Sequence, residues 1–135
     1  MSYLSYKVKG GAMRILVVDD EELICWSLKR AFEKHAGHSV CCVYTGNDAL
    51  QKIMENQYDV VITDLKLPDI SGAELVRKIK ELGIVTPVIV ISSYLSENIL
   101  SDMLKQGVVR CISKPFQIGD ILNSVEHIPH VANKA

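Results

Sequence analysis

The sequence lacks any long apolar run and any marked excess of one charge. Its apolar runs, such as residues 88–91, are far shorter than the roughly 18 residues that suggest a membrane span. The 15 basic and 16 acidic residues nearly cancel, so the overall charge indicates neither nucleic acid nor a membrane surface as a partner. Residues 1–12 contain no apolar stretch of the kind found in signal peptides. These absences predict a cytoplasmic protein whose domain contacts neither nucleic acid nor membrane.

Cysteine is scarce, and its spacing indicates neither a metal site nor a disulfide framework. No C-x-x-C pair is present, and no cysteine stands at a zinc-like interval from a histidine. Cys41 and Cys42 are adjacent and would point to opposite faces of a strand. The thiols are therefore predicted to be reduced and mostly to fill the core; they are Cys25, Cys41, Cys42 and Cys111.

The chain does contain enough apolar material for one domain. Hydrophobic residues make up 48% of its 135 residues, and this length is common for a single domain. We predict that the domain spans residues 13–128. Residues 1–12 show no clean periodicity and are predicted to form a partly disordered N-terminal extension, with Met13 as an alternative start. Residues 129–135 are predicted to be a C-terminal tail or the start of a linker.

Short apolar runs alternate with amphipathic stretches along this domain. Strict alternation of strands and helices implies a parallel sheet with helices on both faces, and right-handed crossovers leave few topologies. We therefore predict an α/β fold, a doubly wound, flavodoxin-like sheet of five parallel strands in the order 2-1-3-4-5. The predicted strands are 14–18, 39–44, 59–63, 87–91 and 108–112, and the predicted helices are 21–35, 47–55, 72–82, 96–106 and 118–128.

Apolar stripes predict which helix faces are buried. In the first helix the inward side is expected to include Leu23, Leu28 and Phe32. In the fourth it is expected to include Met103 and Leu104.

Polar side chains follow four of the predicted strands. Asp19 and Asp20 come after the first strand and Asp64 after the third, while Ser92 follows the fourth and Lys114 lies just beyond the fifth. In a sheet of order 2-1-3-4-5 these four strands are neighbours, and ligands bind at their carboxyl ends. All five side chains are therefore expected to meet in one crevice.

The acidic members of this set suit a magnesium ion. Three carboxylates close together repel each other unless one is protonated or a cation is bound. Mg²⁺ prefers octahedral oxygen coordination and keeps several waters. Asp20 and Asp64 can each supply an oxygen and the backbone carbonyl of Lys66 a third, while Asp19 could bind through water.

A carboxylate beside Mg²⁺ can act as a nucleophile toward a phosphoryl group. Lys114 would neutralise charge on the transferring group from the side opposite the metal, and the Ser92 hydroxyl could hydrogen-bond a phosphate oxygen. Taken singly, each residue also has an ordinary structural interpretation. Asp20 could cap the first helix, Asp64 could be a turn residue and Lys114 a solvated lysine. The occurrence of the whole set at one edge favours the phosphoacceptor interpretation.

Several motifs resemble one known family over residues 13–128. The motifs are ILVVDDEE (15–22), GNDAL (46–50), VVITDLKLPDISG (60–72), PVIVISSY (87–94) and CISKPF (111–116). Together they are similar to the receiver domain of bacterial two-component response regulators, the CheY-like family. Any one of these motifs alone would be unspecific.

The resemblance implies a role for each site residue. Asp64 would be the phosphoacceptor, Asp19 and Asp20 the acidic pair for Mg²⁺, Ser92 the switch hydroxyl and Lys114 the phosphate-pairing lysine. The bond from Lys114 to the proline after it is expected to be cis, a minority state for X-Pro bonds.

The resemblance also implies partners. A sensor histidine kinase would donate the phosphoryl group, and the domain would catalyse its own phosphorylation and dephosphorylation without being a turnover enzyme. A homodimer is expected to use the face made by the helix at 96–106, the strand at 108–112 and the helix at 118–128. An output domain would be present if the chain belongs to a longer regulator.

Two positions differ from the expected pattern or have two interpretations. The position three before Lys114 is Cys111, where the family usually has an aromatic residue that takes part in switching. Tyr94 could substitute for it. Lys66 follows the phosphoacceptor by two residues and is either solvated or affects how fast water attacks the acyl-phosphate.

Other functions fit the residues less well. A Mg²⁺-dependent phosphatase with an aspartyl-phosphate intermediate usually has a second Asp where this chain has Lys66. A nucleotide- or flavin-binding domain would need a glycine-rich loop after the first strand, and none is present. A non-phosphorylated docking pseudo-receiver is disfavoured by the intact acidic set.

Overall fold

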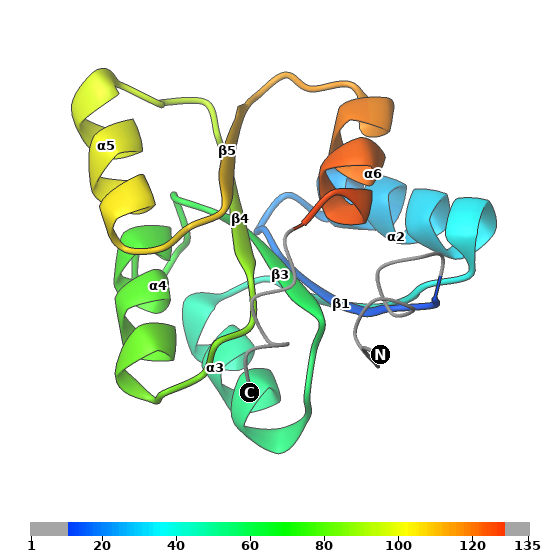
Figure 1. Ribbon diagram of the computed structural model, residues 1–135, viewed down its shortest axis with the longest axis horizontal. Helices are drawn as coiled ribbons and strands as arrows, with labels where there is room; N and C mark the ends of the chain where they lie inside the picture. The colour runs from blue at the N-terminus through cyan, green and yellow to red at the C-terminus, as the bar shows by residue number, and fades with distance from the viewer. Residues whose placement is uncertain (1–10, 129–135) are drawn as a thin grey trace, which may run out of the picture.

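A computed structural model describes residues 11–128 and contains five parallel strands in the order β2-β1-β3-β4-β5 (Figure 1). This is the topology that the sequence predicts. The predicted tail at 129–135 and most of the predicted extension at 1–12 lie outside the described residues. The strands are β1 (Arg14–Val18), β2 (Ser39–Val43), β3 (Val60–Asp64), β4 (Val88–Ser92) and β5 (Arg110–Ser113), and the helices are α2 (Glu22–Ala36), α3 (Gly46–Glu55), α4 (Gly72–Glu81), α5 (Glu97–Lys105) and α6 (Ile118–Glu126).

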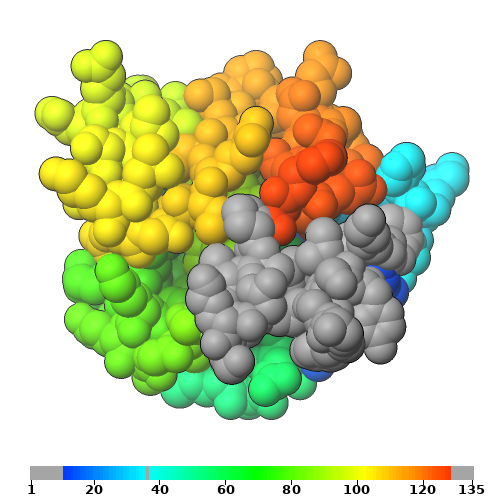
Figure 2. Space-filling model, in the orientation of Figure 1, coloured from blue at the N-terminus to red at the C-terminus, as the bar shows by residue number. Residues whose placement is uncertain are grey.

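Helices cover both faces of the sheet. Helices α2 and α6 pack on one face, and α3, α4 and α5 pack on the other (Figure 1). In the space-filling view, α5 (yellow) and the end of α6 (red) both reach the surface (Figure 2). Alternate residues of β1 supply the two cores: Ile15 and Val17 face α2 and α6, whereas Leu16 and Val18 face the other layer. All four side chains are fully buried, as expected for a strand covered on both faces.

At the carboxyl edge of the sheet, β3 and β4 each extend one residue further than the sequence predicts. Asp64 and Ser92 are the last residues of β3 and β4 rather than the first residues after them. The strand register places Asp64 opposite Ile91, and Ser92 opposite Ser113. Backbone pairing therefore fixes the position of both side chains more tightly than a loop would.

Some residues predicted to be buried are exposed. Leu23 is 72% and Leu104 51% exposed, whereas Met103 is buried as predicted and Cys25 is buried on the inward side of α2. In α2, Cys25, Leu28 and Phe32 are spaced three and four residues apart and so lie on one helix face, from which Leu23 is rotated away. Among residues 11–128, no helix is both long and apolar enough to cross a membrane.

Candidate functional site

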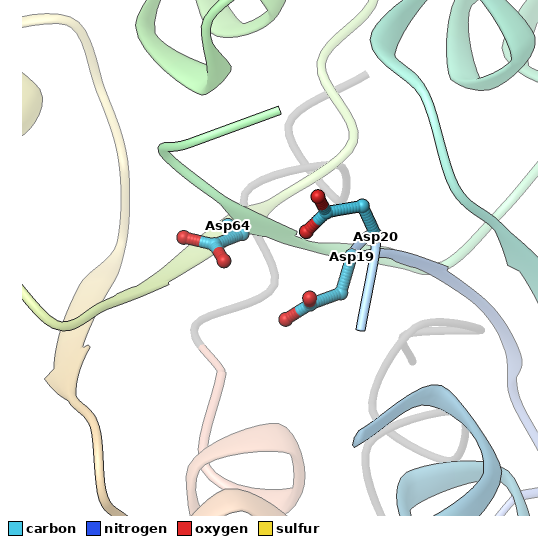
Figure 3. A group of neighbouring side chains, drawn as sticks. All are labelled: Asp19, Asp20 and Asp64. Carbon is cyan, nitrogen blue, oxygen red and sulfur yellow. The ribbon is translucent and has the colours of Figure 1, made fainter. Parts of the chain in front are cut away.

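Three carboxylates lie side by side where β1 and β3 end (Figure 3). One oxygen from each of Asp19, Asp20 and Asp64 lies within 4.8 Å of the others. Asp19 is fully buried and Asp64 nearly so, whereas Asp20 is exposed. Burial raises the pKa of Asp19, although hydrogen bonds from the Glu21 N–H and from Lys114 act in the opposite direction. The carboxylate oxygens of the three aspartates form the hard donor set that a divalent cation prefers, so the cluster fits a metal ion such as Mg²⁺.

Lys114 neutralises the buried part of this cluster. Its ammonium lies 2.7 Å from Asp64 Oδ2, 2.9 Å from Asp19 Oδ2 and 2.8 Å from Glu21 Oε2. Burial alone would lower the pKa of Lys114, but hydrogen bonds to the three carboxylates outweigh it and raise the pKa. The side chain is only 9% exposed, so the interpretation of Lys114 as a solvated loop lysine is wrong. The Lys114–Pro115 bond is cis, as predicted.

The carboxylate at the start of α2 is that of Asp19, not Asp20. The Glu21 N–H donates to Asp19 Oδ1 at 2.9 Å, and Glu21 itself is the N-cap residue. The predicted cap by Asp20 is therefore wrong, and the exposed Asp20 carboxylate is left to face the cluster. The contact of Glu21 with Lys114 was missed from the sequence; its signal is the run of four acidic residues at 19–22.

The loop after β3 folds back onto Asp64. The Lys66 N–H donates to Asp64 Oδ1 at 3.2 Å, and the Gly72 N–H donates to the Leu65 carbonyl at 2.7 Å. These bonds hold the Lys66 backbone beside Asp64.

Asp69 anchors the same loop to α3. Its Oδ1 accepts from the Gly46 N–H and its Oδ2 from the Asn47 N–H, both at 2.8 Å. These N–H groups belong to the first turn of α3 and have no partner within the helix. Burial would raise the pKa of Asp69, but the backbone hydrogen bonds outweigh it and lower the pKa. The sequence did not reveal this contact, which joins segments more than 20 residues apart.

Removing the Asp69 carboxylate is expected to loosen this anchor. Asp69→Ala leaves two N–H groups of α3 without their acceptor, so we expect a loss of about 1 kcal/mol in unfolding free energy. Urea denaturation measures it. Asp48→Ala is the matched control, because Asp48 lies in the same helical turn and its carboxylate accepts none of these hydrogen bonds. Equal losses in the two variants would contradict the anchoring role.

Ser92 and its loop make local contacts. The Ser92 hydroxyl is buried and accepts from the Tyr94 N–H at 3.0 Å. The Tyr94 ring is 72% exposed, and the Lys66 ammonium lies 5.8 Å from its centroid, in a cation–π contact. Lys66 is exposed, as the solvated interpretation predicts, and its ammonium also lies over the Tyr94 ring. Cys111 is half-buried against the core shared by α3, α4 and α5.

The fold and the site define a doubly wound α/β domain with a metal-compatible acidic cluster and a buried lysine at its carboxyl edge. The sequence model of one protein family, the response regulator receiver domain, matches residues 15–126. The chain belongs to this family, which confirms the resemblance seen in the motifs.

Related proteins and solved structures support the same family assignment. The transcriptional regulatory protein DltR of Streptococcus agalactiae is 33% identical over 110 residues, which are 82% of this chain and 49% of that protein. CutR of Streptomyces coelicolor is 34% identical over 84% of this chain and 52% of its own length. A CheY-like receiver domain from Methanospirillum hungatei superimposes with a TM-score of 0.79 at 32% identity, covering 85% of this chain and 91% of that one. The chain thus spans about half the length of these curated relatives.

Family membership decides the broad class of function. The domain is a receiver domain of two-component systems, a class of signalling domain. This favours the predicted class over a nucleotide- or flavin-binding domain.

Proposed function

We propose that Asp64 accepts a phosphoryl group from a sensor histidine kinase. The observation that carries the proposal is the packing of three carboxylates within 4.8 Å of one another beside the buried ammonium of Lys114. Asp19, Asp20, Asp64 and the backbone carbonyl of Lys66 would hold Mg²⁺. The family match supports this assignment, since the site occupies the carboxyl edge of the sheet.

The residues divide the chemistry among them. A carboxylate oxygen of Asp64 attacks phosphorus, so a phosphorus–oxygen bond forms while the bond to the kinase histidine nitrogen breaks, and that nitrogen keeps the electron pair. A bound Mg²⁺ supplies charge neutralisation at the transferring group. Lys114 pairs with a phosphate oxygen instead of with Asp64 Oδ2, from which it now lies 2.7 Å. The Ser92 hydroxyl turns from its own loop to donate to the phosphate.

Phosphorylation is proposed to act through population shift. Its output would be read at the face made by α5, β5 and α6, where a second copy of the domain or another partner docks. Leu100 and Leu104 expose apolar surface on α5 and support this choice. With Cys111 in place of the usual aromatic residue, Tyr94 is proposed to take over that part of the switch.

The wider assignments are proposals of the same kind. We place the receiver domain at residues 13–128 of a cytoplasmic protein. Because the chain spans about half the length of its curated relatives, the whole regulator is proposed to carry an output domain. The domain would catalyse only its own phosphorylation and dephosphorylation.

Incubation with Mg²⁺ and acetyl phosphate tests the proposal directly. Intact mass is expected to show one added phosphate, absent in Asp64→Asn and when EDTA replaces Mg²⁺. Asp48→Asn is the matched control and should still be phosphorylated, because Asp48 lies in the first turn of α3 and is not one of the three clustered carboxylates. Lack of phosphorylation in a folded wild-type domain would favour the docking pseudo-receiver. Repeated release of phosphate from phosphomonoesters would favour the phosphatase.

A further inference from the structure

Two thiols meet between α2 and β2, on the face of the sheet opposite α3. Cys25 projects from α2 and Cys42 from β2, and both pack in the core that contains Val17 and Leu28. Cys42 Sγ donates to the Cys25 carbonyl at 3.4 Å, so the Cys42 thiol lies directly against Cys25 in this core. The pair is formed by tertiary packing, since the two residues are 17 positions apart.

The two thiols have different surroundings. Cys25 is 1% exposed, and its thiol donates to the Asp19 carbonyl at 3.2 Å. Cys42 is half-buried. The hydrogen bond from Cys25, and to a smaller extent the charge of Lys29, lower the pKa of Cys42 although burial raises it. Cys42 is thus the accessible thiol, and Cys25 is the internal thiol beside it.

The geometry points to a peroxide-sensitive dithiol, in which Cys25 and Cys42 close to an intramolecular disulfide between α2 and β2. The Cys42 thiolate attacks one oxygen of hydrogen peroxide, so an S–O bond forms, the O–O bond breaks and the leaving hydroxide takes a proton to become water. The Cys25 sulfur then attacks the Cys42 sulfenic sulfur, so the S–S bond forms, the S–O bond breaks and a second water leaves with the Cys25 proton. Two thiols lose two electrons, and the peroxide gains them.

The other cysteines do not share this arrangement. Cys41 follows the sheet alternation and packs against the opposite core, as Tyr58 does. Cys111 also packs in that opposite core, and no second thiol contributes to the shift of its pKa. Among the described cysteines, only Cys25 and Cys42 pack in the core beneath α2 and α6, where a hydrogen bond joins the Cys42 thiol to the Cys25 backbone.

Oxidation of the two thiols would also change the surroundings of Asp19 in the acidic cluster. Disulfide formation removes the thiol hydrogen that Cys25 donates to the Asp19 carbonyl, and it links the first turn of α2, which follows Asp19 and Asp20, covalently to β2. This consequence rests on the proposed function, because it predicts an altered rate of Asp64 phosphorylation in the oxidised domain. The disulfide itself does not depend on that function.

Treatment of the full chain with hydrogen peroxide, followed by denaturing alkylation and mass spectrometry, tests the pair. Before treatment we expect four alkylated thiols, and afterwards two, with a proteolytic peptide linking Cys25 to Cys42. The link needs no substitution to be seen. Cys42→Ser should abolish it, and Cys111→Ser, the control, should retain it. Dithiothreitol should restore all four thiols.

Other oxidation products would overturn the assignment. A link between Cys41 and Cys42, a link between two chains, or sulfinic acid on Cys42 without any disulfide would each show that Cys25 does not resolve the oxidised thiol. If the disulfide forms but acetyl phosphate modifies reduced and oxidised domains at equal rates, the coupling to Asp19 fails while the dithiol stands. If neither form is phosphorylated, the proposed function fails and the dithiol is unaffected.

Discussion

Gly72→Ala is expected to destabilise the domain by about 3 kcal/mol and to displace the Asp64 backbone. A Cβ atom at this position would collide with the Asp64 carbonyl oxygen and lie 2.7 Å from Leu65 Cα and 2.9 Å from the Asp64 carbonyl carbon. All three atoms belong to the backbone, which cannot move aside as a side-chain tip can. The Gly72 N–H also donates to the Leu65 carbonyl at 2.7 Å, so separating the two segments would break that bond.

Two other glycines provide graded controls in urea denaturation. A Cβ on Gly119 would meet nothing within 4 Å, and Gly119 lies in α6, so Gly119→Ala should be neutral or stabilising. A Cβ on Gly46 would meet mainly the flexible end of Ile70, so Gly46→Ala should have an intermediate effect. If Gly72→Ala unfolds at the same urea concentration as Gly119→Ala, the close approach of α4 to β3 does not exclude a side chain at residue 72, and the expected collision is wrong.

Because Gly72 has no Cβ, the start of α4 can lie directly against the end of β3 at the site. This close approach could not be predicted from the sequence. Sequence pattern predicted the sheet order, because each buried strand is a short run of β-branched residues followed by a helix with an apolar stripe. It also placed Asp19, Asp64 and Lys114 at one edge, because parallel strands end on the same side. These predictions depend on chain direction and periodicity, which are local properties.

Contacts between loops were not predictable in the same way. Asp69 reaches the first turn of α3, Glu21 reaches Lys114, and the Lys66 ammonium lies over Tyr94. Each contact joins segments whose relative position depends on how the finished layers pack. The prediction that Leu23 is buried is wrong for a related reason. The apolar stripe of α2 is wide enough to include Leu23, but the sheet covers only part of the width of that stripe, so Leu23 remains exposed.

Lys114→Met is expected to affect both stability and phosphorylation. The substitution keeps much of the side-chain bulk and removes the charge that lies between Asp19 and Asp64, at 2.9 Å and 2.7 Å from their oxygens. Without metal, the buried Asp19 carboxylate loses its cation, so we expect a loss of about 3 kcal/mol in unfolding free energy. Phosphorylation by acetyl phosphate should slow by about 100-fold or more, because one electrostatic contact to the transferring group is lost.

Urea denaturation with and without Mg²⁺ separates the two effects of Lys114. A divalent cation can replace part of the missing charge, so Mg²⁺ should raise the stability of Lys114→Met more than that of the parent. Lys66→Met is the control, because its ammonium contacts the exposed Tyr94 ring rather than the carboxylates. A Lys114→Met domain as stable as the parent in EDTA would show that the carboxylates tolerate one another without an ammonium. The repulsion between these carboxylates would then be too weak to support the proposed cation site.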